Sequence, residues 1–126
     1  MKAGGGRMSD KKVDLKLRTR EFALRVIRLY STLPSTTVAQ VIGKQLLRSG
    51  TSVGAHYREA SRARSTAEFV SKLGGGQQEL EETSYWFELL VESQIIEGTR
   101  LQPLIQEADE LNANFTTCVK NARNEK

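Results

Sequence analysis

Apolar residues recur at helical spacing in four successive segments of this chain. In the first segment, residues 14–33, the apolar side of the predicted helix carries Leu15, Phe22, Val26, Leu29 and Leu33. At about 100° per residue, Arg18, Arg25 and Arg28 fall together on the opposite side. Pro34 ends this helix, and the hydroxyl groups of residues 35–37 are suited to cap the next one.

The second segment, residues 37–62, predicts a long helix with a continuous buried stripe. The stripe consists of Val38, Ile42, Leu46, Ser49, Val53, Tyr57 and Ala60. Gly43, Gly50 and Gly54 each cost up to about 1 kcal/mol in a helix interior relative to Ala. They indicate either close approach of a neighbouring helix or a local irregularity, or they are simply tolerated weak positions.

The third segment, residues 65–97, carries a repeat of 3.5 residues, which is typical of near-parallel helix packing. Its stripe consists of Phe69, Leu73, Gly76, Leu80, Thr83, Phe87, Leu90 and Gln94. Three consecutive weak helix formers, residues 74–76, predict a kink or a thinned contact inside it. No strand precedes these glycines and no Lys-Ser/Thr follows, so the run does not fit the context of a nucleotide-binding loop.

The fourth segment follows Gly98, which we expect to end the third helix. Thr99 to Gln102 fits a capping box, and Pro103 falls in the first helical turn. The buried side is formed by Leu101, Leu104, Ile105, Ala108, Leu111, Asn112, Phe115, Cys118, Val119 and Ala122. Short connections make consecutive helices antiparallel neighbours, so the sequence predicts an all-α, antiparallel up-down-up-down four-helix bundle.

The length of 126 residues suits one domain. We expect a flexible N-terminal tail at residues 1–12, the bundle at 13–122 and a C-terminal tail at 123–126. The single cysteine cannot form an internal disulfide, and the chain shows neither a signal-peptide pattern nor an apolar run of transmembrane length. These features favour a cytoplasmic protein that does not associate with membranes.

Charge is divided unequally between the two halves of the chain. Residues 1–64 hold 14 of the 19 Lys and Arg and 4 of the 15 Asp and Glu, a net charge of +10, although the whole chain carries only +4. Residues 65–126 hold 5 basic and 11 acidic residues, a net charge of −6. One part of the folded protein is therefore predicted to offer a cationic surface to an anionic partner.

Residue types that support catalysis or cofactor binding are scarce. Carboxylates crowd residues 79–92, but a di-iron site in a helix bundle needs two Glu-x-x-His units, and His56 is the only histidine. We interpret His56 as part of the polar side of the second helix. Cys118 lies on an apolar stripe, where a free thiol behaves as a small hydrophobic group. The sequence therefore predicts no metal, no cofactor and no enzymatic activity.

The basic residues are the strongest functional candidates. Rows of Arg and Lys bind phosphate backbones, and the residues predicted to do so are Arg18, Arg20, Arg25, Arg28, Lys44, Arg48, Arg58, Arg62 and Arg64. In one alternative, Arg58 and Arg62 pair with Glu59, Glu68 or the acids of the third helix, and the charge division holds the bundle together. In another, the partner is a different acidic molecule.

The central part of the chain resembles a known family. It is similar to the bacterial 23S rRNA intervening-sequence proteins, also described as S23 ribosomal protein-like. The residues that carry the similarity are Gln45, Arg48-Ser49, Ser52-Val53, Arg58-Glu59-Ala60, Glu68-Phe69, Glu82-Thr83, Tyr85-Trp86 and Glu88-Leu89-Leu90. The helices before and after this run fit the family more loosely, so the resemblance covers about residues 14–122. The sequence departs from the family pattern at residues 75–78, where the family has apolar or helix-favouring residues.

The resemblance implies both an assembly and a partner. Members form barrel-like homopentamers of antiparallel four-helix bundles, and they include the accessory variability determinant of diversity-generating retroelements, which binds nucleic acid and partners a reverse transcriptase. This implies that the arginine rows face RNA or DNA and that Tyr85 and Trp86 lie near subunit contacts. We therefore expect a non-enzymatic, self-associating accessory or scaffold protein. The alternative is a protein-interaction scaffold without nucleic-acid affinity.

Overall fold

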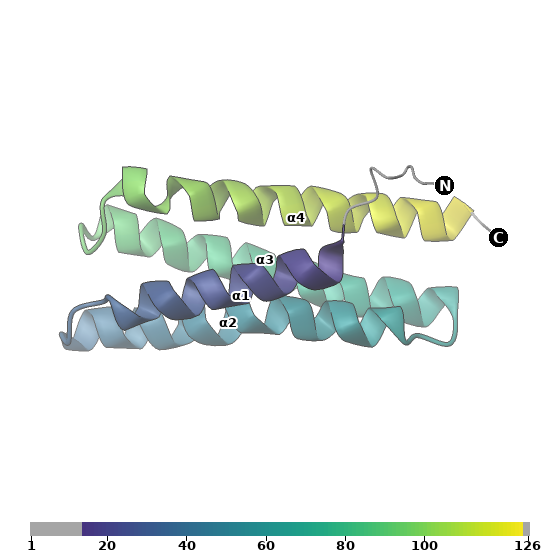
Figure 1. The fold of residues 1–126 in the computed structure, drawn as a ribbon, viewed down its shortest axis with the longest axis horizontal. Coiled ribbons are helices and arrows are strands. Elements are labelled where there is room, and N and C mark those ends of the chain that lie inside the picture. Colours follow the sequence, from purple (N-terminus) through teal and green to yellow (C-terminus); the bar gives the residue numbers. More distant parts are fainter. Residues whose placement is uncertain (1–13, 125–126) are drawn as a thin grey trace.

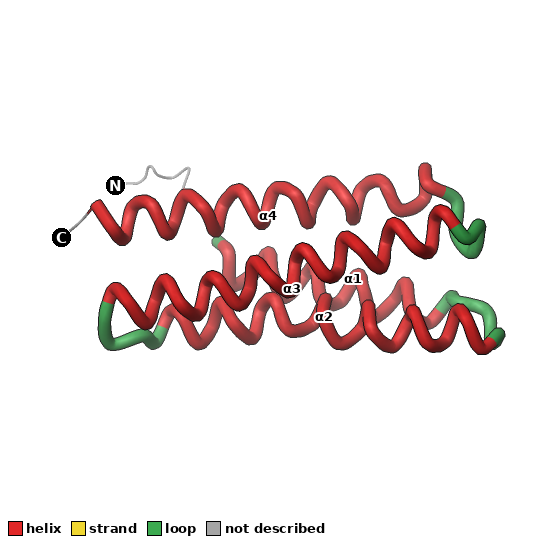
Figure 2. Tube along the Cα trace, turned by 180° about the vertical axis from the view of Figure 1, so that it is seen from behind, coloured by secondary structure: helices red, strands yellow, loops and turns green. Residues whose placement is uncertain are grey.

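The computed structural model describes residues 14–124, and these residues form four α-helices. The helices are α1 (Leu15–Ser31), α2 (Thr37–Ser61), α3 (Thr66–Glu92) and α4 (Gly98–Asn124). They run alternately up and down, as Figures 1 and 2 show. The predicted all-α four-helix bundle is confirmed for this part of the chain. The predicted tail at residues 1–12 lies outside the described residues, and α4 continues two residues beyond the predicted end of the bundle.

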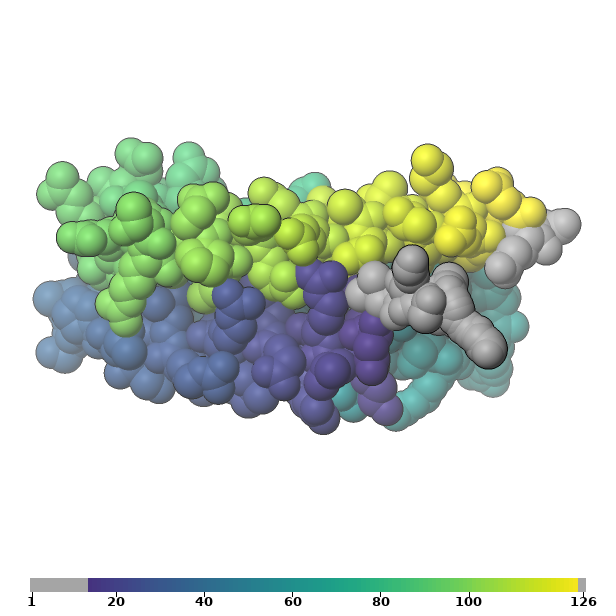
Figure 3. Space-filling model, turned by 45° about the horizontal axis from the view of Figure 1, so that its top comes forward, coloured from purple at the N-terminus to yellow at the C-terminus, as the bar shows by residue number. Residues whose placement is uncertain are grey.

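Each helix packs against its neighbour in sequence, and α1 also contacts α4. With 17 residues, α1 is much shorter than the other three helices, which have 25 to 27. It therefore leaves the end of the bundle near the α2–α3 turn to three helices (Figure 1). On the face seen in Figure 3, α4 and α1 lie side by side.

The core is built from the apolar stripes of all four helices. Its largest fully buried side chains are Phe22, Phe87, Phe115, Leu46, Leu73, Leu80, Leu90, Leu101 and Leu111. Two predicted core positions are wrong. Val38 is 57% exposed, because Ala39 in the first turn of α2 takes the inward position. Gln94 is exposed, because the helix has already ended there.

Side-chain caps fix the starts of the first three helices. Asp14, Thr36 and Ser65 each accept a hydrogen bond from the backbone N–H three residues later, at 3.0, 3.3 and 3.0 Å respectively. Such a cap contributes about 1 kcal/mol to helix stability. Among the hydroxyl groups after Pro34, that of Thr36 thus caps the next helix as the sequence indicated, and Ser65 does the same for α3.

The connection between α3 and α4 differs from the prediction. Helix α3 ends at Glu92, not at Glu97, and Gly98 is the first residue of α4. The N–H groups of Gln94 and Ile95 donate to the carbonyls of Val91 and Leu90, which is a Schellman motif with Gln94 at φ 64°. This turn carries Ile96 into the core at 5% exposure. Burial of that side chain explains why the helix stops early.

Glycines on α2 allow α1 to approach closely. A Cβ atom at Gly43 would lie 2.6 Å from Leu33, and one at Gly50 would lie 2.9 Å from Val26. At Gly54 the same atom would lie 3.1 Å from the Thr19 hydroxyl. The interpretation of these glycines as helix-contact positions is confirmed, because Gly50 and Gly54 face side chains of α1, and Gly43 also faces Tyr30 of α1, at 2.9 Å.

The glycine run of α3 is helical throughout. A Cβ at Gly75 would lie 2.8 Å from the His56 ring, and one at Gly76 would lie 2.7 Å from the ring of Phe115, whereas nothing lies within 4 Å of a Cβ at Gly74. The contact at residues 75 and 76 is therefore close, not thinned as predicted, because the missing side chains leave room for these two rings.

Substitution of neighbouring glycines in α3 should change stability in opposite directions. Gly74→Ala should raise the free energy of unfolding by up to about 1 kcal/mol, because Ala favours the helix and the space is open. Gly76→Ala should lower the free energy of unfolding, because Phe115 is fully buried and cannot move aside. The overpacking costs about 1–3 kcal/mol, and the gain in helix propensity offsets only part of it. Urea denaturation of both variants measures the difference. Equal effects would contradict the close-contact interpretation.

Candidate nucleic-acid interface

Arg18 joins α1 to α4. Its Nη2 lies 2.6 Å from Glu107 Oε1 and 3.0 Å from Glu110 Oε1, and its Nε donates to Glu107 Oε2 at 3.0 Å. The hydrogen bond with Glu107 is the main reason that the pKa of Arg18 is raised above its ordinary value. Arg18 therefore faces a neighbouring helix and not, as the helical wheel indicated, the side opposite the core.

Arg48 joins α2 to α3 in a similar way. Its Nη2 lies 2.6 Å from Glu82 Oε2, and its Nη1 lies 3.4 Å from Glu79 Oε1. Trp86 Nε1 also donates to Glu82 Oε2, at 3.1 Å. The bond from Arg48, assisted by the one from Trp86, holds the pKa of Glu82 below its ordinary value. Two of the nine predicted phosphate-binding residues thus have carboxylate partners within the chain.

His56 lies between α2 and α3 and not on an open polar side. Its ring packs against the backbone at Gly75, and its Nε2 lies 3.7 Å from Glu79 Oε2. Deeper in the same contact, Thr83 donates to Ser49 at 2.8 Å. Among residues 14–124, no group of three or more His, Cys, Asp or Glu side chains is placed to hold a metal ion.

A cluster of cations lies on the outer side of α1 and α2. We define the α1–α2 basic surface as Lys16, Arg20, Arg58 and Arg62. The contact between Gly54 and Thr19 sets the register of these antiparallel helices. Arg58 lies one turn after Gly54 on α2, and Lys16 lies about one turn before Thr19 on α1. Because the helices are antiparallel, these two steps lead in the same direction, so Arg58 and Lys16 lie at a similar level. The four cations therefore occupy neighbouring turns.

The members of this surface differ from Arg18 and Arg48 in their surroundings. Lys16, Arg20 and Arg62 are exposed and Arg58 is half-buried. None of the four forms an ion pair with another residue of the described range. Glu59, which lies between Arg58 and Arg62 in sequence, is instead 3.4 Å from Lys72 of α3. The charges of the α1–α2 basic surface are therefore available to a partner.

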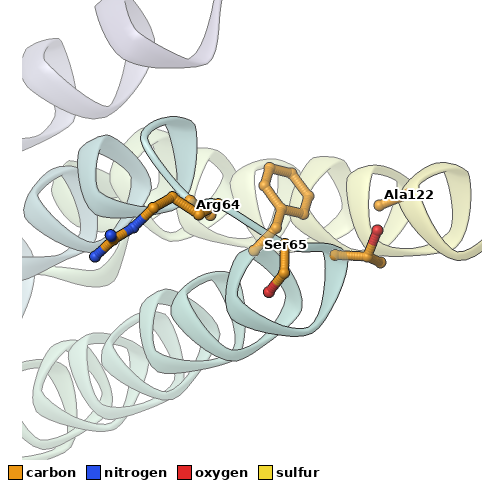
Figure 4. Close-up of a pocket in the computed structure, with 6 residues that line it drawn as sticks. Arg64, Ser65 and Ala122 are labelled. Carbon is orange, nitrogen blue, oxygen red and sulfur yellow. The ribbon is translucent and has the colours of Figure 1, made fainter.

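Lys44 lies apart from this cluster, and Arg64 follows Arg62 in the chain. Lys44 is exposed about four turns before Arg58 on α2, and Arg64 lies in the α2–α3 turn, where its backbone N–H donates to Glu68 at 3.1 Å. A hollow of about 460 Å³ opens there between the turn and Ala122 of α4. In Figure 4 the guanidinium of Arg64 points away from Ala122. The Arg64 charge is therefore not directed toward the α4 side of the hollow.

Exposed apolar side chains form a second surface. Among the large ones, Val38 and Val41 lie on α2 and Tyr85 lies on α3, at 57%, 57% and 52% exposure. The Tyr85 ring centroid is 5.1 Å from that of Trp86. We call Val38, Val41, Tyr85 and Trp86 the α2–α3 apolar surface. Three further exposed apolar residues, Leu17, Leu24 and Ile27, lie on α1.

Two further cations, Lys16 and Arg100, lie on these basic surfaces but are not among the nine residues predicted from the sequence. Lys16 precedes Arg20 by four residues, a helical spacing that could have identified it. Arg100, in the first turn of α4, lies with Arg25 and Arg28 around a separate groove between α1 and α4. No sequence pattern reveals that grouping, because it depends on how α4 lies across α1.

The geometry defines an antiparallel four-helix bundle whose outer face carries cations that no described carboxylate neutralises. Residues 11–117 match the family described as 23S rRNA-intervening sequence protein. The chain belongs to this family, as its resemblance indicated. A comparison with curated proteins gives no match.

A solved structure supports the same assignment. The chain is similar to a protein of unknown function from the S23 ribosomal protein family of Bacteroides thetaiotaomicron, with 38% sequence identity and a TM-score of 0.79. The similarity covers 84% of this chain and 98% of that one. Within the described helices, no segment is both long and apolar enough to cross a membrane.

The Arg48–Glu82 pair should make stability depend on pH on the acid side. The pKa of Glu82 in the folded protein lies below its ordinary value of 4.5, so the unfolded chain binds more protons in that window. The stabilisation is complete above pH 4.5 and is lost as pH falls through the folded pKa. Urea denaturation between neutral and acidic pH should therefore show a smaller acid-side loss for Arg48→Gln than for the parent. An Arg20→Gln control should retain the parental loss, and an unchanged profile in Arg48→Gln would contradict the assignment.

Proposed function

We propose that this protein is a non-enzymatic, oligomeric four-helix bundle that binds nucleic acid through the α1–α2 basic surface. The observation that carries the proposal is the contrast among the arginines. Arg18 and Arg48 bind carboxylates within the chain, whereas Arg20, Arg58 and Arg62 have no such partner among residues 14–124. Cations left unpaired on an exposed face are suited to phosphate groups.

The arrangement favours contact with a phosphate backbone over contact with base edges. Lys16 and Arg20 are four residues apart on α1, and Arg58, in the last turn of α2, is four residues before Arg62, which caps the end of that helix. Each pair therefore lies along its own helix, so the cations form two short parallel rows. Long cationic side chains in rows position a nucleic acid without reading its sequence. The resemblance to accessory proteins of retroelements further suggests that a reverse transcriptase, or another enzyme acting on nucleic acid, is a partner.

We assign self-association to the α2–α3 apolar surface. Arg48 and Trp86 both bind Glu82, which places their helices side by side at this level. Going toward the start of α2 from Arg48 leads in the same direction as going toward the end of α3 from Trp86, so Val41 is level with α3 about one turn beyond Trp86. Contiguous exposed apolar groups of this kind are typical of protein interfaces. The family resemblance implies that the assembly is a homopentamer.

A second candidate function is a protein-interaction scaffold without affinity for nucleic acid. The carboxylate pairs of Arg18 and Arg48 favour it, because they show that basic residues of the first half bind acidic residues of the second half. If the remaining arginines did the same between subunits, the charge division would serve assembly alone. Reversing the charge of those arginines should remove nucleic-acid binding under the first function and the oligomer under the second.

Reversing the charge of Arg58 and Arg62 should separate the two functions. Arg58→Glu with Arg62→Glu should weaken binding to labelled structured RNA or duplex DNA by at least about tenfold at low salt, because two phosphate contacts become repulsive. The oligomer should stay intact. Fluorescence anisotropy and light scattering measure the two properties.

The matched control is Lys120→Glu with Arg123→Glu, which reverses the same number of exposed charges near the end of α4. It should weaken binding much less. Equal loss in both variants would show that overall charge, not the α1–α2 basic surface, governs binding. Loss of the oligomer in the Arg58 and Arg62 variant would favour the scaffold function.

A charge placed in the α2–α3 apolar surface should break the assembly. The parent should scatter light as a particle of five times the 14.1 kDa chain mass. Val41→Glu should reduce that mass, because an unpaired carboxylate would be buried between subunits. Leu24→Glu, at a comparably exposed apolar residue of α1, should leave the mass unchanged. If Leu24→Glu alone dissociates the protein, the interface lies on α1.

A further inference from the structure

A separate groove lies between the C-terminal half of α1 and the first turns of α4. Its volume is about 300 Å³, and its wall carries Arg25, Arg28 and Arg100 together with Thr32. Leu29, Leu101 and Leu104 form a buried floor. Figure 3 shows the two helices side by side on this face of the molecule. The groove thus combines an apolar base with three guanidinium groups from two helices.

The position of Arg100 is fixed by a hydrogen bond across the groove. Arg100 Nη2 donates to Thr32 Oγ1 at 3.0 Å, and this hydroxyl donates to the carbonyl of Leu29 at 2.8 Å. Arg100 therefore reaches from α4 to the end of α1 without a carboxylate to attract it. A guanidinium has five N–H donors, and this bond uses only one of them.

The comparison with Arg18 shows what the groove lacks. Arg18 lies seven residues before Arg25, on the same side of α1, and there α4 supplies Glu107 and Glu110. Two turns farther along, α4 supplies Arg100 and Pro103 instead. The same helix contact is therefore neutralised at one level and carries only positive charge at the next.

No described carboxylate balances this positive charge. Glu21 lies four residues before Arg25, and Glu97 lies three residues before Arg100, but neither forms an ion pair with the groove arginines within the described residues. Three like charges around one small volume repel one another. A multivalent anion bound between them would relieve that repulsion, and the planar guanidinium group matches the oxygens of phosphate in bidentate fashion.

We infer that the α1–α4 groove is a binding site for a phosphate group, held by Arg25, Arg28 and Arg100. It is distinct from the α1–α2 basic surface, because Arg25 and Arg18 face α4 whereas Arg20 lies on the side of α1 toward α2. The phosphate is either that of a free anion or the terminal phosphate of a nucleic acid. The inference does not depend on the proposed function, since the groove holds its ligand by charge and shape alone.

The test uses the full chain and inorganic pyrophosphate as the probe. Calorimetric titration at low salt should show saturable binding, and Arg100→Gln and Arg25→Gln should each weaken it by about tenfold or more, since each removes a charge-assisted contact. Arg123→Gln, which removes the same charge near the end of α4, outside both the groove and the α1–α2 basic surface, should change it by less than about twofold. Circular dichroism and light scattering confirm that each variant keeps its fold and assembly.

The outcomes are decisive in either direction. Absence of saturable pyrophosphate binding, or equal weakening by Arg123→Gln and Arg100→Gln, would overturn the inference. Tighter binding of 5′-phosphorylated than of 5′-hydroxyl RNA, with the difference abolished by Arg100→Gln, would identify the ligand as a nucleic-acid end. Equal affinity for the two RNAs, with pyrophosphate binding retained, would identify a free anion. Loss of RNA affinity in the Arg58 and Arg62 variant tests the proposed function separately.

Discussion

The close approach of α2 to both of its neighbours is the constraint on which the rest of the structure depends. On one side, Gly43, Gly50 and Gly54 have no side chain to hold α1 away. On the other, His56 of α2 fills the space that Gly75 leaves on α3. Overpacking such contacts costs more than the helix propensity gained, so the weak helix formers remain at these positions. With both inner sides of α2 occupied by close packing, its charged residues are confined to the edges of those contacts and to the outer face.

That confinement explains how a chain with a net charge of only +4 carries a localised cationic face. Arginines at the edge of a helix contact, such as Arg18 and Arg48, meet glutamates of α4 and α3 and are neutralised. Arg58 and Arg62 are on the outer side of α2 and meet none within the described chain. Arg25 and Arg100 are an intermediate case, because they lie at a helix contact but face another arginine. Position relative to the contacts, and not residue type, thus decides which cations are available.

Periodicity was sufficient to predict the four helices, their antiparallel order and most of the core, because a 3.6-residue pattern reports directly which side of a helix is buried. Details that depend on tertiary contacts could not be predicted. From the sequence, the glycines of α2 could be either helix-contact positions or tolerated weak helix formers. The packing of Val26 and Thr19 against two of them shows that they are contact positions. Helix α3 ends early because the turn that follows it buries Ile96. A helical pattern of apolar residues cannot reveal a turn whose effect is to bury a single side chain. A helical wheel drawn for α1 alone likewise could not show that Arg18 binds two carboxylates of α4, whereas Arg28 forms no ion pair within the described residues.

The central functional claim is that the four unpaired cations of the α1–α2 basic surface contact phosphates. Its most direct measurement is the affinity of the unmodified protein for single-stranded RNA as a function of salt concentration. Each phosphate contact releases counterions and contributes about −0.7 to the slope of log K against log salt, so four contacts predict a slope near −3. A slope near zero, or no binding at low salt, would contradict the account and leave the basic surface without a nucleic-acid role.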